Sequence, residues 1–331
     1  MSLIKMTETN SSNHCPICDS KKTKFIFESW DYTYGYPGTF PIWKCKNCGH
    51  MYLPDNFTPE MLTEMYSNYY PRSQYAEQYE PYTERKGFLA WLDGKNAGCH
   101  FFVPKNVRIL DIGCGGCEAL GYHKARGCEV WGCEADENVR KIADRLGVNV
   151  NIGLFNPKDY EKDYFDYVTM SHVLEHSIEP VEMLRQVHSV LKPNGKLVIG
   201  VPYPYCIENF LFGRYWIGWH TPFHLNLFSK KSMRLLLDKS GFRYEFSKSS
   251  TPSIRLLHQW AVLFVHGKQG KPMRFRVASW AHRESFGDEL ERLWYVRLYR
   301  FLEKARVFAL PVRFADAIGV GMNQIYVATK H

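Results

Sequence analysis

The stretch Val107-Arg-Ile-Leu-Asp-Ile-Gly-Cys-Gly-Gly116 joins a short apolar run to a cluster of glycines. The apolar run is typical of a buried parallel strand. The glycines that follow it allow a tight turn and leave no Cβ between the backbone and a ligand. They are Gly113, Gly115 and Gly116. A helix is expected from about Glu118, so the order strand, glycine turn, helix predicts the first unit of a nucleotide-binding α/β sheet.

The next predicted strand, residues 129–134, ends in an acid. Glu134 lies 23 residues after Asp111, where folds of this kind place a carboxylate that accepts both ribose hydroxyls. The sequence contains no Gly-x-x-x-x-Gly-Lys loop for a nucleoside triphosphate. Asp111, at the end of the first strand, would repel a pyrophosphate but suits a sulfonium and an ammonium group. These two acids therefore favour a positively charged thioether nucleoside as the ligand.

With these residues the sequence resembles the class I S-adenosylmethionine-dependent methyltransferases. The matching stretches are 110–115, Glu134, 165–168, 172–176 and 191–196. The resemblance covers about residues 105–250. It implies an α/β fold with a Rossmann-like seven-stranded sheet, parallel except for one antiparallel strand, and S-adenosylmethionine as the methyl donor. One position departs from the family, because Cys117 stands where a third glycine is usual. A Rossmann-like domain that binds another ligand is the alternative.

The resemblance assigns further residues to the methyl-donor site, beside the three glycines and the two acids. Leu154 lies where the family places the loop that flanks the adenine. Ser171 ends the fourth predicted strand, and in open α/β sheets ligands lie beyond the carboxyl ends of the strands. Tyr70, together with Tyr69, lies in a tyrosine-rich segment that in this family often closes over the donor. For these tyrosines the alternative role is to cover the edge of the sheet.

The segment after the fourth strand carries candidate catalytic residues. His172, Glu175 and His176 follow Ser171 closely, and an oxygen acceptor needs a base because a sugar hydroxyl does not ionise alone at neutral pH. The string His-x-x-Glu-His also occurs in a class of zinc proteases, but there it lies within a continuous helix. A divalent cation held by Glu175 and His176 is a second option. Some ubiquinone-type O-methyltransferases look similar here, although they carry a carboxylate at the position of His172.

An aromatic loop at residues 210–228 supplies a fourth catalytic candidate, His224. Its sequence resembles a methyltransferase subgroup that often carries a zinc ribbon and commonly methylates sugars or surface-glycan intermediates. Aromatic rings stack on the apolar faces of sugars, and a histidine can take a hydroxyl proton. We therefore expect a small-molecule acceptor, first of all a sugar in polysaccharide biosynthesis, with O-methylation favoured over C-methylation. A structural role under the loop is the alternative for His224.

Two Cys-x-x-Cys pairs precede the sheet. The four cysteines are Cys15, Cys18, Cys45 and Cys48. Two such knuckles can present four thiolates tetrahedrally to Zn²⁺. The sequence thus predicts a structural zinc ribbon at residues 14–51, a segment too small to keep a core without the metal. The alternative function is an RNA base methyltransferase that reads RNA with the ribbon. Lysines and acids are mixed in this segment without a clear basic stripe, so nucleic acid is not the expected partner.

The rest of the chain is organised around these two parts. We expect a disordered tail at 1–13, a linker with cap helices at 52–104 and a methyltransferase domain at 105–331, with a helical insertion at about 251–321. The sequence has neither a run of about 18 apolar residues nor a secretory signal, and its cysteine usage favours the cytoplasm. The net charge of +8 permits an acidic acceptor or an anionic membrane surface. A basic amphipathic helix of the insertion is a candidate for contact with the inner membrane face.

Overall fold

The computed structural model describes residues 14–54, 57–70, 82–96, 98–252, 256, 259, 262–263, 267–272 and 294–331. The chain divides into two compact units of three segments each. The first unit consists of Met1–Arg72, Pro202–Ser232 and Thr251–Met322, and the second of Ser73–Val201, Met233–Ser250 and Asn323–His331. The predicted tail at 1–13 lies outside the described residues. Because the two units cut across the predicted linear domains, the boundaries of those domains stay a prediction.

The second unit contains the predicted α/β sheet. Among the described residues it has seven strands in the order β10-β11-β8-β7-β4-β5-β6. They are β4 (Arg108–Ile112), β5 (Glu129–Glu134), β6 (Asn149–Ile152), β7 (Phe165–Ser171), β8 (Leu191–Pro202), β10 (Phe242–Ser250) and β11 (Asn323–Lys330). Neighbours from β6 to β8 pair in parallel, and β10 pairs with β11 antiparallel. The predicted fold class, a Rossmann-like mixed sheet with an antiparallel pair, is confirmed.

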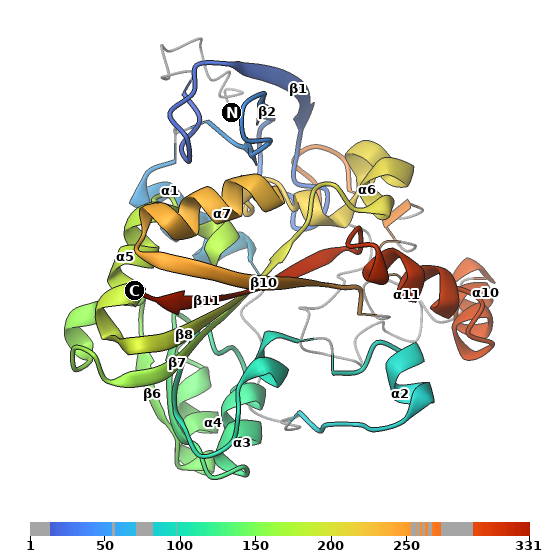
Figure 1. The fold of residues 1–331 in the computed structure, drawn as a ribbon. Helices are drawn as coiled ribbons and strands as arrows, with labels where there is room; N and C mark the ends of the chain where they lie inside the picture. The colour runs from blue at the N-terminus through green and yellow to red at the C-terminus, as the bar shows by residue number, and fades with distance from the viewer. Residues whose placement is uncertain are drawn as a thin grey trace. The chain divides into compact units, whose positions relative to one another are not determined.

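Helices cover both faces of this sheet (Figure 1). On one face lie α3 (Glu118–Lys124) and α4 (Val139–Leu146), and on the other lie α5 (Pro180–Val190) and α7 (Lys230–Lys239), which begins in the first unit. Leu120 of α3 and Ile142 of α4 pack against Ile109 and Val130 of the strands. This packing puts the apolar stripe of each helix on the core. Short elements complete the unit: α2 (Phe88–Leu92), η2 (Cys99–Phe102), η3 (Pro157–Asp159) and η4 (Leu174–His176).

The first unit begins with the cysteine ribbon. Strands β1 (Thr23–Ser29) and β2 (Phe40–Cys45) pair antiparallel. The sheet continues through β3 (Met51–Tyr52) to β9 (Asn226–Leu227), in the order β1-β2-β3-β9. His50, which is fully buried, bonds through Nε2 to Oδ1 of Asn226 at 3.1 Å. A segment from the middle of the chain therefore completes the ribbon sheet.

The helices of the first unit come from all three of its segments. Among the described residues they include α1 (Pro59–Glu64), the π-helix η1 (Met65–Tyr69), α6 (Ile207–Phe212), η5 (Gly213–Tyr215), η6 (Ile217–Trp219), α10 (Trp294–Lys304) and α11 (Ala309–Ala317). Thr58 caps α1, because its Oγ1 accepts from the backbone N–H of Met61 at 3.3 Å. None of the helices in the described part of the chain is both long and apolar enough to span a bilayer.

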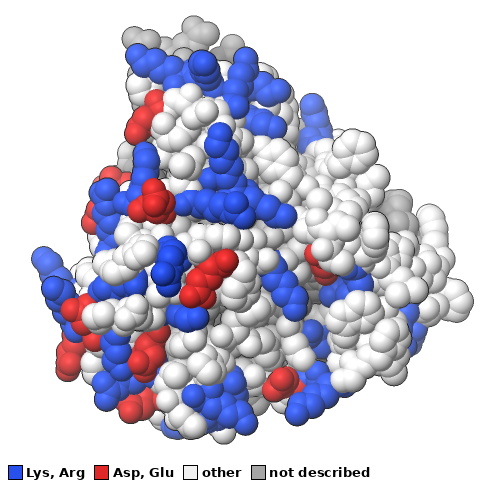
Figure 2. Space-filling model, in the orientation of Figure 1, with Lys and Arg blue, Asp and Glu red and all other residues white. Residues whose placement is uncertain are grey.

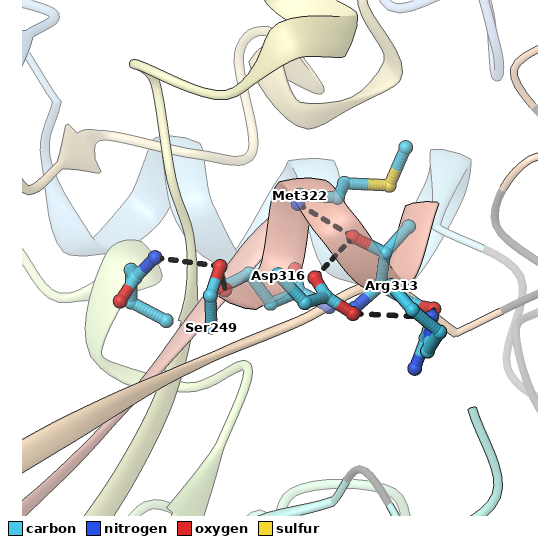
Figure 3. A network of polar contacts seen from close by, with 7 residues as sticks. Ser249, Arg313, Asp316 and Met322 are labelled. Atoms are coloured by element: carbon cyan, nitrogen blue, oxygen red, sulfur yellow. Dashed lines mark hydrogen bonds and ion pairs between the residues drawn. The ribbon is translucent and has the colours of Figure 1, made fainter. Parts of the chain in front are cut away.

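A polar network holds α11 in the first unit (Figure 3). Asp316 accepts hydrogen bonds from the backbone N–H and the hydroxyl of Thr251 at 3.1 and 2.8 Å. It also pairs with Arg313 at 3.1 Å, and both of these side chains are largely buried. The backbone N–H of Met322 donates to Thr251 Oγ1 at 3.0 Å. These contacts fix the rotation of α11 about its axis, so the opposite face of the helix points outward.

Candidate functional site

The glycine turn after β4 is tied to the neighbouring strand. The backbone N–H groups of Gly113 and Cys114 both donate to the carbonyl oxygen of Cys133, at 2.8 and 3.1 Å. Gly113 and Gly115 adopt left-handed φ angles of 70° and 51°, which glycine reaches without steric cost. A Cβ on Gly115 would meet no described atom within 4 Å. The turn therefore borders open space at the carboxyl end of β4.

Cys117 takes the place of the third glycine in the family pattern and is itself left-handed, with a φ of 62°. This conformation costs a non-glycine residue about 1–2 kcal/mol. The Cys117 side chain is fully buried and belongs to the core cluster that contains Leu120 and Val139. Packing of the thiol offsets the backbone cost, so the turn keeps its path and α3 follows at once.

Asp111 lies in β4 and is almost entirely buried. Its pKa is raised to about 7, chiefly by burial; a hydrogen bond from Thr169 opposes the rise, and the nearby carboxylates of Glu134 and Glu118 add to it. The hydroxyl of Thr169 donates to Asp111 Oδ1 at 2.6 Å. The two residues face each other in the parallel pairing of β4 with β7. Sequence reasoning missed Thr169, although its place two residues before the end of β7 was the available signal.

Glu134 ends β5 beside the turn. Its Oε2 accepts from the backbone N–H of Gly115 at 3.0 Å, and its Oε1 accepts from the N–H of Asp136 at 3.1 Å. Each carboxylate oxygen can accept a further hydrogen bond. The carbonyl oxygen of Glu134 also accepts from Gly153, and the next residue, Leu154, is 87% exposed. The structure thus brings Asp111, the glycines, Glu134 and Leu154 together at the carboxyl ends of the parallel strands.

His172 follows Ser171 at the end of β7 and adopts a left-handed φ of 58°. Its backbone N–H donates to the carbonyl of Gly200 at 2.8 Å, and its Nδ1 lies 3.0 Å from Oε1 of Glu175. The Glu175 side chain is fully buried. Burial acts to raise its pKa, but the hydrogen bond with His172 and the charges of His172 and His176 bring the pKa below its ordinary value. Glu175 is therefore ionised at neutral pH.

The His-x-x-Glu-His string does not lie within an α-helix. It begins just after β7 ends at Ser171, and only Leu174–His176 form a turn of 3₁₀-helix. A zinc protease needs both histidines on one face of a continuous helix. The protease reading, which the sequence already disfavoured, has no helix here to support it.

Gly113 and the 172–176 segment lie in contact, because a Cβ on Gly113 would overlap Cγ2 of Val173. We expect Gly113→Ala to destabilise the protein by about 3 kcal/mol, from overpacking and the left-handed φ together. Gly115→Ala should cost only about 1 kcal/mol, because it meets open space. Urea unfolding measures both. Val173→Ala in the Gly113→Ala background should recover part of the loss, and equal effects of the two glycine variants would contradict this contact.

Comparison with known proteins identifies the family. The model of a family described as a methyltransferase domain matches residues 74–245, just over half of the chain. The chain belongs to this methyltransferase family. The match spans the glycine turn, Glu134 and the 172–176 segment. The protein is therefore an S-adenosylmethionine-dependent methyltransferase, as the sequence predicts.

Two curated relatives of this methyltransferase are similar to it over part of the chain. A ubiquinone biosynthesis O-methyltransferase of Coxiella burnetii is 28% identical over 181 residues, which cover 46% of this chain and 76% of the relative. An enzyme of the same name from Xanthomonas axonopodis pv. citri is 35% identical over 105 residues, which cover 29% of this chain and 43% of the relative.

Solved structures of S-adenosylmethionine-dependent methyltransferases are similar to the chain at low identity. One from Mesorhizobium loti has a TM-score of 0.44 and 15% identity, over 70% of this chain and 95% of that one. Another from Archaeoglobus fulgidus has a TM-score of 0.40 and 21% identity, over 67% of this chain and 86% of that one.

Two predicted site residues of the methyltransferase, Tyr70 and His224, belong to the first unit. The ring of Tyr70 lies 5.3 Å from that of Tyr34 and 5.4 Å from that of Phe223. His224 is buried, with Nδ1 at 2.8 Å from the carbonyl of Gly218 and Nε2 at 3.4 Å from Nδ1 of His220. A carbonyl only accepts, so His224 donates from Nδ1. Both residues are built into an aromatic cluster, and their predicted roles stay predictions.

The four ribbon cysteines come together in the first unit. The sulfurs of Cys15 and Cys48 are 3.5 Å apart and those of Cys18 and Cys45 are 3.6 Å apart, and all four lie within 4.8 Å of one another. Four sulfurs around a tetrahedral zinc, each about 2.3 Å from the metal, would be separated by roughly 3.8 Å. The donor set and its spacing therefore fit Zn²⁺.

Proposed function

We propose that this methyltransferase transfers the methyl group of S-adenosylmethionine to an oxygen atom of a hydroxylated small molecule. The observation that carries the proposal is the His172–Glu175 pair at the carboxyl end of β7, next to the glycine turn of β4. A base beside a methyl donor is what an oxygen acceptor requires. The O-methyltransferase name of the relatives supports the same acceptor atom.

The donor would lie across the carboxyl ends of β4, β5 and β7. Asp111 would face its positively charged groups and Glu134 its ribose hydroxyls. Gly113, Gly115 and Gly116 would let the backbone approach it, with Leu154 against the adenine and Ser171 beside the methyl group. Support comes from the buried carboxylate at 111, the open space at Gly115 and the exposed Leu154. Tyr70 as a cap over the donor remains a separate proposal.

S-adenosylmethionine supplies an activated methyl group, and its transfer forms a carbon–oxygen bond while the carbon–sulfur bond breaks. The acceptor hydroxyl must lose its proton as this happens. His172 is the proposed base, because its side chain is 27% exposed whereas Glu175 is fully buried. Glu175 holds Nδ1, which orients the ring and stabilises the imidazolium once Nε2 has taken the proton. The left-handed backbone at His172 fixes its side chain at the carboxyl end of β7.

We expect His172→Gln to lower kcat by about 10²–10³-fold, which lies within the range of general-base catalysis. Glu175→Gln keeps the shape of the side chain but removes its charge, and we expect it to lower kcat by about 10²-fold because the imidazolium loses its partner. Binding of S-adenosylmethionine, measured by calorimetry, should change little in either variant. His176→Gln is the matched comparison and should lower kcat least, and a larger loss there would make His176 the base.

The acceptor can be found with tritium-labelled S-adenosylmethionine and fractionated extract. Label in a small molecule, with the methyl group on oxygen by NMR, is the expected result. We keep a sugar as the predicted acceptor, supported by the subgroup resemblance of residues 210–228. Label on carbon would favour the C-methylation alternative. Label in RNA would replace the proposal with the RNA alternative, for which the ribbon lysines would supply the contacts.

We also propose that the four ribbon cysteines bind a structural Zn²⁺. The second knuckle has the backbone that such a site needs, because Gly49 is left-handed with a φ of 75° and its N–H donates to the carbonyl of Cys45 at 3.0 Å. The N–H of Cys48 points at the sulfur of Cys45 at 3.5 Å. Zinc would join two short strands that bury few apolar side chains of their own.

A further inference from the structure

The helical pair α10–α11 of the first unit exposes an apolar surface, here called the α10–α11 face. On α10 the exposed residues Trp294, Leu298 and Phe301 recur at positions i, i+4 and i+7. On α11 and its C-cap the exposed residues Leu310, Phe314 and Ile318 recur at i, i+4 and i+8. Residues with this spacing lie on one side of a helix. Each helix therefore has an apolar stripe that the described residues leave open.

The stripes are the outer faces of firmly packed helices. In α10 the opposite side buries Val296 and Tyr299, which are 0% and 3% exposed. In α11 the opposite side carries Arg313 and Asp316, which the network with Thr251 holds in place (Figure 3). Neither helix can turn its apolar stripe inward without breaking these contacts. Exposed Phe and Trp side chains on a fixed helix face are typical of an interaction surface.

Cations outnumber acids around the α10–α11 face. Residues 294–318 contain five cations and two acids. Both acids are paired within the unit, Glu303 with Arg300 at 3.4 Å and Asp316 with Arg313 at 3.1 Å. Three cations are exposed: Arg297, Lys304 and Arg306. Figure 2 shows the surface over α10 and α11 as a mainly white area with blue side chains along it.

We propose that the α10–α11 face binds an anionic lipid surface. An amphipathic helix that combines Trp, Phe and Leu with Arg and Lys lies in the interface of a membrane, with its apolar side chains among the acyl chains and its cations at the phosphates. A second copy of the chain fits the face less well. A symmetric dimer would bring Arg297, Lys304 and Arg306 of the two copies together at one interface, and like charges there disfavour it.

Nearby α6 extends the same argument. Its Phe210 and Leu211 are 88% and 64% exposed. The helix begins beside the end of α11, because the N–H of Ile207 donates to the carbonyl of Val320 at 3.0 Å. Membrane contact through three helices of one unit would hold the enzyme where acceptors with a lipid anchor are found.

Vesicle co-sedimentation of the full chain tests the proposal. We expect the protein to sediment with phosphatidylglycerol vesicles at low salt, to do so at least tenfold less with phosphatidylcholine vesicles, and to be released by about 0.5 M salt, where charges are screened. Phe301→Ser with Phe314→Ser should lower the bound fraction at least tenfold. Phe88→Ser is the matched control, because Phe88 is 65% exposed and Phe301 and Phe314 are 68% and 65% exposed, but Phe88 lies on α2.

Three results would overturn the proposal. The protein could remain in the supernatant with anionic vesicles. It could bind phosphatidylcholine equally well at all salt concentrations. Light scattering could also show a dimer that the double variant converts to a monomer, which would make the face an interface between copies. Thermal unfolding of the double variant should match that of the wild type, since the substituted side chains are exposed.

Discussion

Asp111→Asn is expected to weaken binding of S-adenosylmethionine about 100-fold, the loss that follows when a charged hydrogen-bonding partner is removed. The substitution keeps the shape of the side chain, and Asn can still accept the hydrogen bond from Thr169. Only the negative charge that would face the donor is lost. Titration calorimetry with the donor measures the effect, and unchanged affinity would remove Asp111 from the proposed site.

The pKa of about 7 for Asp111 predicts that donor affinity of the wild type depends on pH. A positively charged ligand favours the ionised carboxylate, so binding should release a proton below pH 7. We expect affinity to fall about fivefold from pH 7 to pH 6 and to fall further below that, because one required deprotonation with a pKa of about 7 gives a slope that approaches tenfold per pH unit only below the pKa. Above pH 8 affinity should be constant. Asp111→Asn should lack this dependence.

The same pKa predicts that Asp111→Asn raises the stability of the protein, although the substitution weakens donor binding. The folded carboxyl has a pKa of about 7 and the unfolded one about 3.8. Between these values the folded state holds the extra proton, so the wild type loses stability as pH rises from about 4 to 7. Asn does not titrate. Without ligand, the free energy of unfolding of Asp111→Asn relative to that of the wild type should therefore increase by roughly 2–3 kcal/mol as pH rises from 5 to 8.

Asp166, on β7, supplies the matched control. Burial acts to raise its pKa, but the hydrogen bonds from Lys192 Nζ at 2.6 Å and from the N–H of Arg108 bring it below the ordinary value. Its ionised form stabilises the fold above the unfolded pKa, and that contribution is lost as pH falls. Asp166→Asn should thus destabilise at pH 8 and leave donor affinity unchanged. If both aspartate variants shift stability in the same direction, the opposite pKa shifts assigned to Asp111 and Asp166 are wrong.

Much of the second unit could be predicted from sequence because its signals are local. The apolar run before Gly113 marks β4 and the glycine turn that follows it, and the acid at 134 marks the end of β5. Each signal lies within a few residues. One antiparallel strand was expected as well, from the family resemblance. By contrast, β3 and β9 are two residues long, so they carry no periodicity, and their pairing depends on a contact between segments far apart in the chain.

The candidate site was predicted in part for the same reason. Asp111 and Glu134 stand at strand ends, which sequence reasoning can locate. Thr169 was missed because its importance comes from the register between β4 and β7, which no local pattern fixes. The left-handed backbone of His172 was also missed, since only a few per cent of non-glycine residues adopt it and no local pattern marks this one. The path of the turn at Cys117 depends on burial of its thiol, which only the packed core reveals.

Cys45→Ser is expected to remove the metal and to unfold the ribbon. A serine hydroxyl is a poor zinc ligand, and three remaining thiolates leave the coordination incomplete. Elemental analysis of the wild type should find about one zinc per chain, because two knuckles form one four-sulfur site. The variant should contain little. Loss of a structural zinc removes several kcal/mol of folding free energy, so we expect an earlier, separate unfolding step or insoluble protein.

The contacts of the second knuckle explain why the effect should spread through the first unit. Ser229, which caps α7 by accepting from the N–H of Ser232 at 2.9 Å, donates to the carbonyl of Cys48 at 2.6 Å, and Tyr205 donates to the carbonyl of Gly49 at 2.6 Å. Cys206→Ser is the control, because Cys206 is buried in the same unit and caps α6, a role that serine also fills. It should keep the zinc and the melting temperature. Of Cys45 and Cys206, only Cys45 contributes a sulfur to the four-cysteine cluster. Wild-type protein without zinc, or Cys45→Ser protein as stable as Cys206→Ser protein, would therefore contradict the metal assignment.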